Sequence, residues 1–306
     1  MRYLVIFLFT LLAACSGPRN ESEKPEAAPE PEALSFSGQP LMARVPDSVS
    51  AAKSDSLVAA IRVKADLTEE DYIAIGRSLS GIGQFRRAVE AYTEGLAKYP
   101  DSYRLLRHRG HRYINIRQLE PAIADLSKAA QLIPQEPPVY ETDASGKPGA
   151  SYQHQIWYHI GVYHFLKRDY ASGAEAFEKS LATAYSGGDK AGASDWLYNC
   201  AMRAGNKERA AAVAKPFTTD FNIENKDYPY YRRLLLYNNV IKPGELVDED
   251  ASVKDMSLTE LTKLYGLANY YLYQGDTTRA RTLYSKVLES SEWAGFAYAS
   301  AELDAR

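Results

Sequence analysis

Histidine is the residue of this chain best suited to hold a metal, but its spacing argues against a metal site. All five histidines fall between His108 and His164. His108 and His111 are three residues apart in one stretch, whereas His159 and His164 are five apart in another. A metal site needs three or four ligands that converge with supporting carboxylates. This spacing does not provide such a set, so we expect no bound metal and no other cofactor.

Catalytic motifs give no better case for an enzyme. The sequence contains no His-Glu-x-x-His, no Gly-x-Ser-x-Gly and no phosphate loop. The segment 186–194 (SGGDKAGAS) has glycines and a lysine. It lacks the spacing that surrounds phosphates, and it is more typical of a turn between repeats. We therefore predict that the protein is not an enzyme.

Cys15 ends an N-terminal stretch that must be set aside before the fold is considered. Arg2 supplies a positive charge, and an apolar run that is too short to span a bilayer follows it. The run ends Leu12-Ala13-Ala14-Cys15, which resembles a bacterial lipobox. That resemblance implies a signal peptide at 1–14, cleavage before Cys15, and acylation of the cysteine. Two or more acyl chains would attach the protein stably to a membrane. The alternative is an ordinary secretory signal that happens to contain a cysteine.

The cysteine count and the balance of charges exclude an intramolecular disulfide and argue against a nucleic-acid partner. Cys200 is the only other cysteine, so with Cys15 lipidated no intramolecular disulfide can form. Stability must come from packed apolar surface, and 45% of the residues are hydrophobic. The chain has 36 basic and 39 acidic residues without a basic stripe, so we expect no nucleic-acid partner.

Residues 15–42 are rich in Pro, Glu, Ser and Ala, which predicts a disordered tether. Ser16 follows the lipidation site, and no Asp stands there. In the best-studied sorting system, that pattern resembles a lipoprotein sent to the outer membrane.

The rest of the chain repeats itself with a period of 34 residues, and the period predicts the fold. Small and large apolar residues recur in register between the segments 69–102 and 103–136. The matching pairs are Gly76 and Gly110, Leu79 and Tyr113, Phe85 and Leu119, Ala88 and Ala122, Tyr92 and Leu126, and Pro100 and Pro134.

This pattern resembles the tetratricopeptide repeat, in which two antiparallel helices pack closely. The resemblance implies an all-α, right-handed superhelical solenoid over residues 43–306. Gly76 and Gly110 are predicted to lie where helices cross, because a larger side chain would push the helices apart. Further units are expected near 154–187, 191–218 and 261–292, with a degenerate unit at 225–252. Segments 47–64 and 293–306 are expected to form the capping and closing helices, and the Pro- and Gly-rich residues after 136 a loop.

In this family the concave groove is lined by fixed positions of each first helix. Carried onto this sequence, the resemblance implies a basic first half and an aromatic, amide-rich second half. The Lys and Asn set of chaperone-type carboxylate clamps is not reproduced. An ordinary solvated helix face would also carry several arginines. The predicted peptide-binding residues are Arg77, Arg104, Arg107, His111, Asn115, Tyr158, Tyr265 and Asn269.

The order of parts resembles that of the NlpI-type outer-membrane lipoproteins, which are tetratricopeptide adaptors. The likeness includes a leading helix, two regular repeats, the segment SDWLY and a late LYGLANYYLYQGDTTRARTLYSKVLE. It implies a lipid-anchored scaffold of the cell envelope, on the outer membrane facing the periplasm. Its partners would be other envelope proteins, such as peptidoglycan hydrolases, proteases or assembly factors. The alternatives are a fixed component of an outer-membrane assembly machine and a carbohydrate- or nutrient-binding lipoprotein.

Overall fold

The computed structural model describes residues 30–142 and 148–306. The predicted signal peptide, Cys15 and the tether up to residue 29 lie outside the described residues. In the part of the chain that is described, no helix is both long and apolar enough to cross a bilayer.

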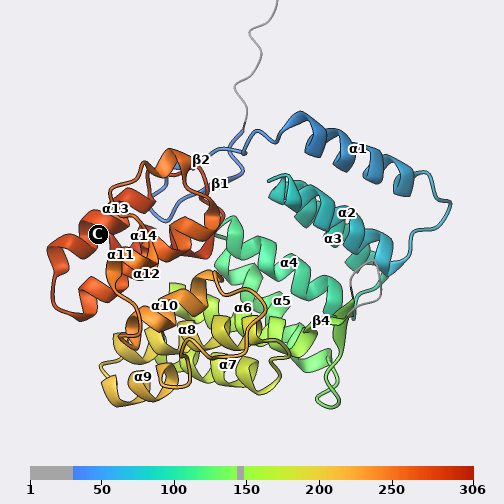
Figure 1. The fold of residues 1–306 in the computed structure, drawn as a ribbon. Coiled ribbons are helices and arrows are strands. Elements are labelled where there is room, and N and C mark those ends of the chain that lie inside the picture. Colours follow the sequence, from blue (N-terminus) through green and yellow to red (C-terminus); the bar gives the residue numbers. More distant parts are fainter. Residues whose placement is uncertain (1–29, 143–147) are drawn as a thin grey trace, which may run out of the picture. The chain divides into compact units, whose positions relative to one another are not determined.

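Helices account for most of the described chain and follow one another in adjacent pairs (Figure 1). The pairs α2/α3, α4/α5, α6/α7, α8/α9 and α12/α13 each pack together. The prediction of an all-α tetratricopeptide solenoid is therefore correct. The helices are α1 (Ser48–Arg62), α2 (Glu69–Gly81), α3 (Phe85–Lys98), α4 (Tyr103–Asn115), α5 (Leu119–Leu132), α6 (Tyr152–Leu166), α7 (Tyr170–Ala182), α8 (Gly187–Arg203), α9 (Lys207–Ala214), α10 (Pro229–Tyr237), α11 (Pro243–Leu246), α12 (Leu258–Tyr273), α13 (Thr277–Val287) and α14 (Phe296–Asp304).

The helix crossings explain why glycine recurs with the repeat period. A Cβ atom at Gly76 would lie 2.3 Å from the ring of Tyr92, and one at Gly110 would lie 2.8 Å from Leu126. Both distances are too short for carbon atoms in contact. The prediction that these two glycines lie at close crossings is confirmed.

Turns inside the repeats require a left-handed backbone. Gly83, Gly205 and Gly275 have φ values of 81°, 78° and 88°, which glycine adopts without steric cost. Arg117 occupies the position 34 residues after Gly83 and has φ of 64°. Because a side chain is disfavoured there, other contacts of Arg117 must compensate for the strain.

Two short hairpins depart from the expected organisation. Strands β3 (Tyr140–Thr142) and β4 (Pro148–Ser151) pair where a loop was expected between the second and third repeats. Strands β1 (Ala33–Leu34) and β2 (Pro40–Leu41) pair within the predicted tether. The tether boundary at residue 42 is therefore wrong, because the apolar side chains of Ala33 and Leu41 are buried in a cluster with Trp293.

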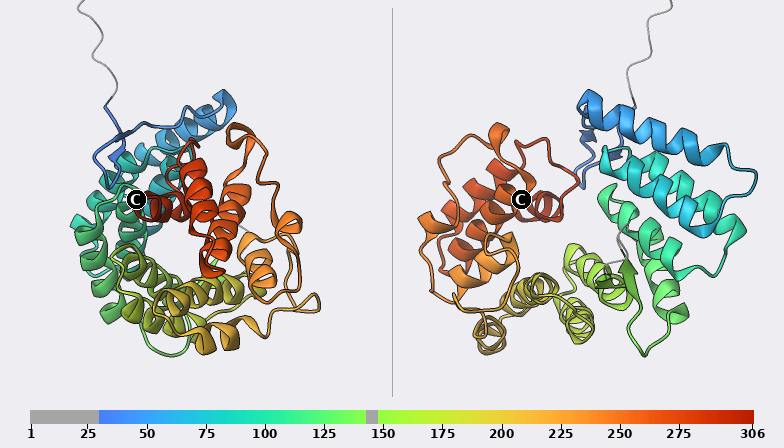
Figure 2. Two further views of the ribbon diagram at one scale, coloured as in Figure 1. Left: turned by 90° about the vertical axis from the view of Figure 1, so that its left-hand side faces the viewer. Right: turned by 45° about the vertical axis from the view of Figure 1, so that its right-hand side comes forward.

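The last helix of the solenoid returns to the first repeats (Figure 2). Helix α14 packs on α12 and α13 and also touches α6. Arg117, in the α4–α5 turn, forms a buried ion pair with Glu302 (Nη2–Oε1 2.8 Å) and donates a hydrogen bond to the carbonyl of Trp293 (2.7 Å). Asn115 donates to the carbonyl of Ala294 (2.7 Å). These closure contacts join residues 115–117 to residues 293–302. The sequence pattern predicts a closing helix at 293–306 but not its contacts with the α4–α5 turn.

Candidate protein-binding site

Two of the predicted groove arginines are neutralised by the β3 strand. Arg77 forms an ion pair with Glu141 (2.7 Å), and Arg107 lies 3.6 Å from the same carboxylate. His108 also lies 3.6 Å from it. Arg107 is buried, with 6% of its surface exposed. The basic first half of the predicted groove is therefore not left as free positive charge, because an insertion outside the repeat pattern supplies a carboxylate.

Arg104 is also paired, but within the repeat array. Its Nη1 atom contacts Glu69 (2.9 Å), its Nη2 atom contacts Glu70, and its Nε atom donates to the hydroxyl of Tyr152 (3.1 Å). Reversing the charges of Arg104 and Arg107 would break these ion pairs. Such a double reversal therefore tests folding as much as binding.

Tyr265 and Asn269 do not line a groove. Both are fully buried, and they belong to a polar network inside the C-terminal half. The Tyr265 hydroxyl donates to Asp304 (2.9 Å), while Asn269 accepts hydrogen bonds from Arg203 (2.9 Å) and Tyr284 (2.6 Å). Their assignment as binding residues is wrong, because α14 and Arg203 cover the face that the repeat pattern leaves open.

Tyr158 is half-buried on the inner side of α6. Its hydroxyl accepts a hydrogen bond from the indole Nε1 of Trp196 (2.7 Å). Burial raises the pKa of Tyr158 well above its usual range. Its ring centroid lies 6.5 Å from that of Phe296 in α14, so α6 and α14 meet here through aromatic side chains.

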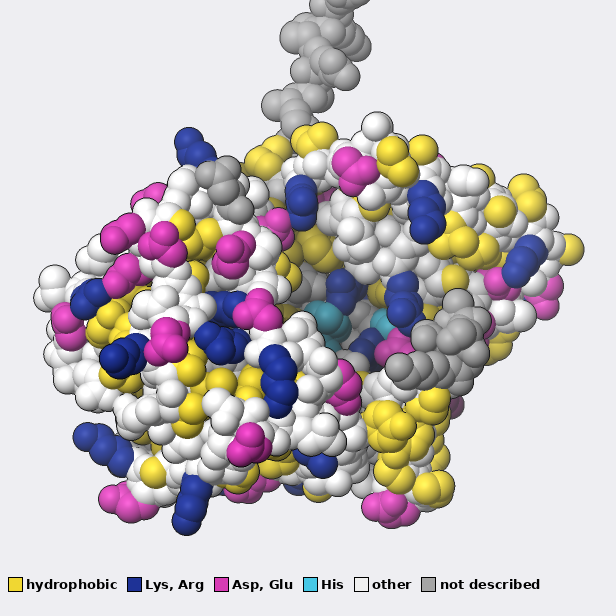
Figure 3. Space-filling view, viewed as in Figure 1, with side chains coloured by type: hydrophobic (Ala, Val, Ile, Leu, Met, Phe, Trp, Pro, Cys, Tyr) yellow, Lys and Arg dark blue, Asp and Glu magenta, His cyan; other side chains and the backbone are white. Residues whose placement is uncertain are grey.

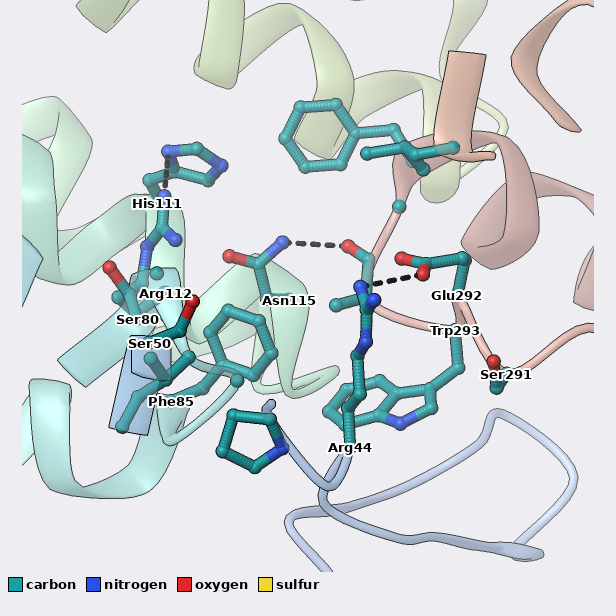
Figure 4. Close-up of a pocket in the computed structure, with 18 of the residues that line it drawn as sticks. Arg44, Ser50, Ser80, Phe85, His111, Arg112, Asn115, Ser291, Glu292 and Trp293 are labelled. Carbon is teal, nitrogen blue, oxygen red and sulfur yellow. Dashed lines mark hydrogen bonds and ion pairs between the residues drawn. The ribbon is translucent and has the colours of Figure 1, made fainter. Parts of the chain in front are cut away.

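A cavity of about 640 Å³ brings together the remaining predicted residues, His111 and Asn115 (Figure 4). Its walls come from the start of α1, the α2–α3 turn, the end of α4, the segment 291–296 and the start of α12. Arginine and histidine side chains gather in the hollow on this side of the molecule (Figure 3). The residues that line the cavity include Arg44, Asp47, Ser50, Ser80, Phe85, His111, Arg112, Asn115, Tyr230, Glu292, Trp293 and Phe296.

Arg112 has no acidic partner within the described part of the chain. Its Nη2 atom contacts Nδ1 of His111, and its guanidinium lies 5.8 Å from the ring centroid of Phe85. Burial lowers the pKa of Arg112 to about 10. The side chain therefore remains positively charged at neutral pH, although no carboxylate compensates for its desolvation.

The histidines of this region are held neutral. The ring centroids of His111 and His159 lie 4.1 Å apart. Burial, and next the positive charge of Arg112, hold the pKa of His111 well below its usual range. Burial, and next Arg107, do the same for the pKa of His159. Neutral His111 can accept the hydrogen bond from Arg112, but it cannot balance that charge.

Sequence reasoning missed Arg112, Glu141, Trp293 and Phe296. One signal was available: α4 carries Arg104, Arg107, Arg109 and Arg112 without a single acidic residue. Three of these arginines find carboxylates on other segments, whereas Arg112 does not. In the described part of the chain, no group of three or more His, Cys, Asp or Glu side chains could hold a metal ion.

Paired helices with glycine at their crossings define a tetratricopeptide array, a fold that serves protein–protein interaction. Residues 73–137 match the tetratricopeptide repeat family model. No curated protein matches the chain.

Solved structures with the same kind of fold include a tetratricopeptide repeat protein from Parabacteroides merdae, YrrB and MamA. The first is 15% identical with a TM-score of 0.48, covering 82% of this chain and 92% of that one. YrrB, described as having an unusual peptide-binding site, is 13% identical with a TM-score of 0.43, covering 77% and 92%. MamA is 18% identical with a TM-score of 0.39, covering 70% and 93%. Likeness at this level carries no argument about function.

Proposed function

We propose that this protein is a lipid-anchored scaffold of the bacterial cell envelope, which binds other proteins on the inner side of its repeat array and catalyses no reaction. The repeat fold supports the scaffold role. The lipobox-like residues around Cys15 support the anchor, and Ser16 supports the outer membrane as its location. Peptidoglycan hydrolases, proteases and assembly factors are the envelope proteins that the NlpI-type layout suggests as partners.

One observation carries the binding role: the inner helices meet around an open cavity with an uncompensated cation. Successive helices α2, α4 and α6 touch one another, so a single partner segment can contact several repeats. Most cations on this side are satisfied internally, whereas Arg112 is not. A partially desolvated charge without a carboxylate is costly, and a partner that supplies one would be bound more tightly.

The competing proposal of a carbohydrate-binding lipoprotein rested on tyrosines in the second half of the groove. Of the two predicted groove tyrosines, Tyr265 is fully buried, and Tyr158 is half-buried with its hydroxyl bonded to Trp196. Tyr265 and Tyr284 are buried with ring centroids 5.5 Å apart, and Tyr198 stacks on Tyr237 at 4.4 Å. They offer no exposed aromatic platform, so we favour a protein partner.

One experiment in cells tests both the lipid anchor and the binding of partners at the cavity. A photo-reactive amino acid replaces Ser80 on the cavity wall or, as a matched control, exposed Lys128 on α5. Irradiation should cross-link envelope proteins to the Ser80 variant far more than to the Lys128 variant. Equal cross-linking from both positions would contradict the binding face. Cys15→Ser should release the chain from membranes or leave it unprocessed, and a processed chain that stays membrane-bound would contradict the anchor.

A further inference from the structure

The cavity is built by the closure of the array and not by the repeat groove alone. One wall is the end of α4, which carries Arg112 and Asn115. The opposite wall is the segment 291–296, about 180 residues later in the chain. Asn115 connects the two walls through its hydrogen bond to Ala294. The cavity therefore exists only while the two ends of the array are in contact.

Among the buried side-chain nitrogen and oxygen atoms of these walls, only two lack a hydrogen-bond partner. Arg44 pairs with Glu292 (2.8 Å), and Asp47 accepts the backbone N–H of Ser50 (2.9 Å) as the cap of α1. Arg112 has neither an ion pair nor a hydrogen bond from its Nε atom, and the buried Oδ1 atom of Asn115 has no donor. Asn115 is 5% exposed. A cation and an acceptor are thus left unpaired side by side, three residues apart on one helix face.

These two groups define the chemistry of a ligand. Arg112 requires a carboxylate, which a guanidinium can hold by two hydrogen bonds. Asn115 Oδ1 requires a donor such as a peptide N–H. Phe85, Trp293, Phe296 and Tyr230 surround the pair with aromatic surface. The volume of about 640 Å³ lies in the range of roughly 300–1,000 Å³ that is typical of ligand pockets. A lone inorganic ion would leave most of it unfilled.

We propose that this closure cavity binds an acidic peptide segment of a partner protein, with its carboxylate on Arg112, its backbone N–H on Asn115 Oδ1 and a neighbouring apolar side chain against the half-buried ring of Phe296. The proposal rests on the scaffold function above and names the segment that the scaffold recognises. Because the ligand touches both walls, it also holds the ends of the array together. Binding therefore stabilises the closed state, as any ligand stabilises the state to which it binds.

The test uses fluorescein-labelled octapeptides of alternating glutamate and phenylalanine, with glutamine–phenylalanine peptides as neutral controls. Fluorescence anisotropy with the full chain should show that the acidic peptide binds at least about tenfold more tightly than the neutral one, as expected for a charge-assisted hydrogen bond. A version with an amidated C-terminus separates side-chain carboxylates from a terminal carboxylate. Equal binding of acidic and neutral peptides would overturn the proposal.

Two variants locate the site. Arg112→Gln should remove the preference for the acidic peptide, while Arg44→Gln, in the same cavity but already paired with Glu292, should retain it. Ser50→Glu places a carboxylate on the cavity wall at the first turn of α1, a position that favours an acidic side chain. It should fold normally and weaken acidic-peptide binding by a similar factor. Circular dichroism confirms folding of each variant.

Cross-linking in cells separates this inference from the scaffold function. If the Ser80 cross-linking variant captures envelope proteins and adding Arg112→Gln to it leaves the capture unchanged, the cavity inference fails and the scaffold function stands. If the Ser80 variant captures none, the scaffold function fails. Acidic-peptide binding that does not raise the melting temperature would overturn the coupling to closure.

Discussion

In the first two repeats, Gly76 and Gly110 face the ring of Tyr92 and the branched side chain of Leu126. In the last repeat, the position that corresponds to Gly76 is Ala268, while Gly266 of α12 faces α10, where a Cβ atom would lie 2.4 Å from Cγ of Arg233. The crossings within the first two repeats are filled by apolar side chains, whereas the contact between α10 and α12 is filled by a charged one. The side chains that fill close contacts between helices therefore differ in chemistry between the two regions of the array.

The charged core of the C-terminal half is extensive. Arg233 and Asp195 form an ion pair at 2.9 Å with both side chains fully buried. Arg203 and Asp304 form a second at 2.8 Å, and Asn269 joins that network. Buried charges are strongly destabilising when one partner is lost, so they tie α8, α10, α12 and α14 to specific neighbours. The core of the first two repeats is mainly apolar, and their ion pairs range from exposed, as in Lys98–Asp66, to buried, as in Arg117–Glu302.

The largest effect should come from breaking the buried pair. Arg233→Met leaves Asp195 unpaired in the core and should lower the free energy of unfolding by about 3–5 kcal/mol. Urea denaturation measures the change. Adding Asp195→Asn should recover most of it. The matched control is Arg209→Met, which breaks an exposed pair with Glu178 and should cost less than about 1 kcal/mol. Similar costs for Arg233→Met and Arg209→Met would show that buried charge does not distinguish the two regions.

Acid should affect the first half more than the second, because residues 165–306 contain no histidine. Burial first, and neighbouring arginines next, hold the pKa values of His108 and His111 well below 6.5 in the folded state, and burial does so for His159. Below pH 6.5 the unfolded chain therefore binds protons that the folded chain does not. The corresponding stability is present above that pH and is lost as pH falls, by about 1.4 kcal/mol per pH unit for each histidine.

Urea denaturation between pH 7.5 and 5.5 measures this slope, which should approach about 4 kcal/mol per pH unit for the three histidines together. His111→Gln should reduce it by about one third. Hydrogen exchange at pH 5.5 should show loss of protection in α4–α6 before α12–α13. An unchanged slope in His111→Gln would mean that His111 gains its proton in the folded state as readily as in the unfolded chain.

A smaller effect is expected from the apolar crossing itself. Gly110→Leu should cost about 1–3 kcal/mol, because the added atoms overlap Leu126 and must displace it. Gly81→Leu is the matched control, since a Cβ atom at Gly81 meets nothing within 4 Å. Thermal melts followed by circular dichroism compare the two variants. If they melted together, the 34-residue glycine period would have no role in packing.

The sequence was sufficient to predict the fold of the first two repeats, because the six paired positions between 76 and 134 are set by local helix packing. It was not sufficient for the site. The repeat pattern predicts which way Arg77 and Arg107 face, but not that Glu141 of an insertion meets them. It likewise places Asn269 on a first helix without showing that Arg203 and α14 cover it. The 34-residue repeat pattern therefore cannot predict contacts made by segments that do not belong to the repeats.

The closure contacts also constrain the order in which the protein can fold. Arg117 and Glu302 are 185 residues apart, and Phe36 and Glu302 are 266 apart. Helix pairs within a repeat close loops of a few residues, so they can form as soon as their segment of chain is available. The closure contacts of Arg117 therefore cannot form until the chain has been made as far as Glu302. A nascent chain that has not reached Glu302 would carry formed repeats without the cavity, so the proposed binding of a partner has to wait for the contacts between residues 115–117 and 293–302.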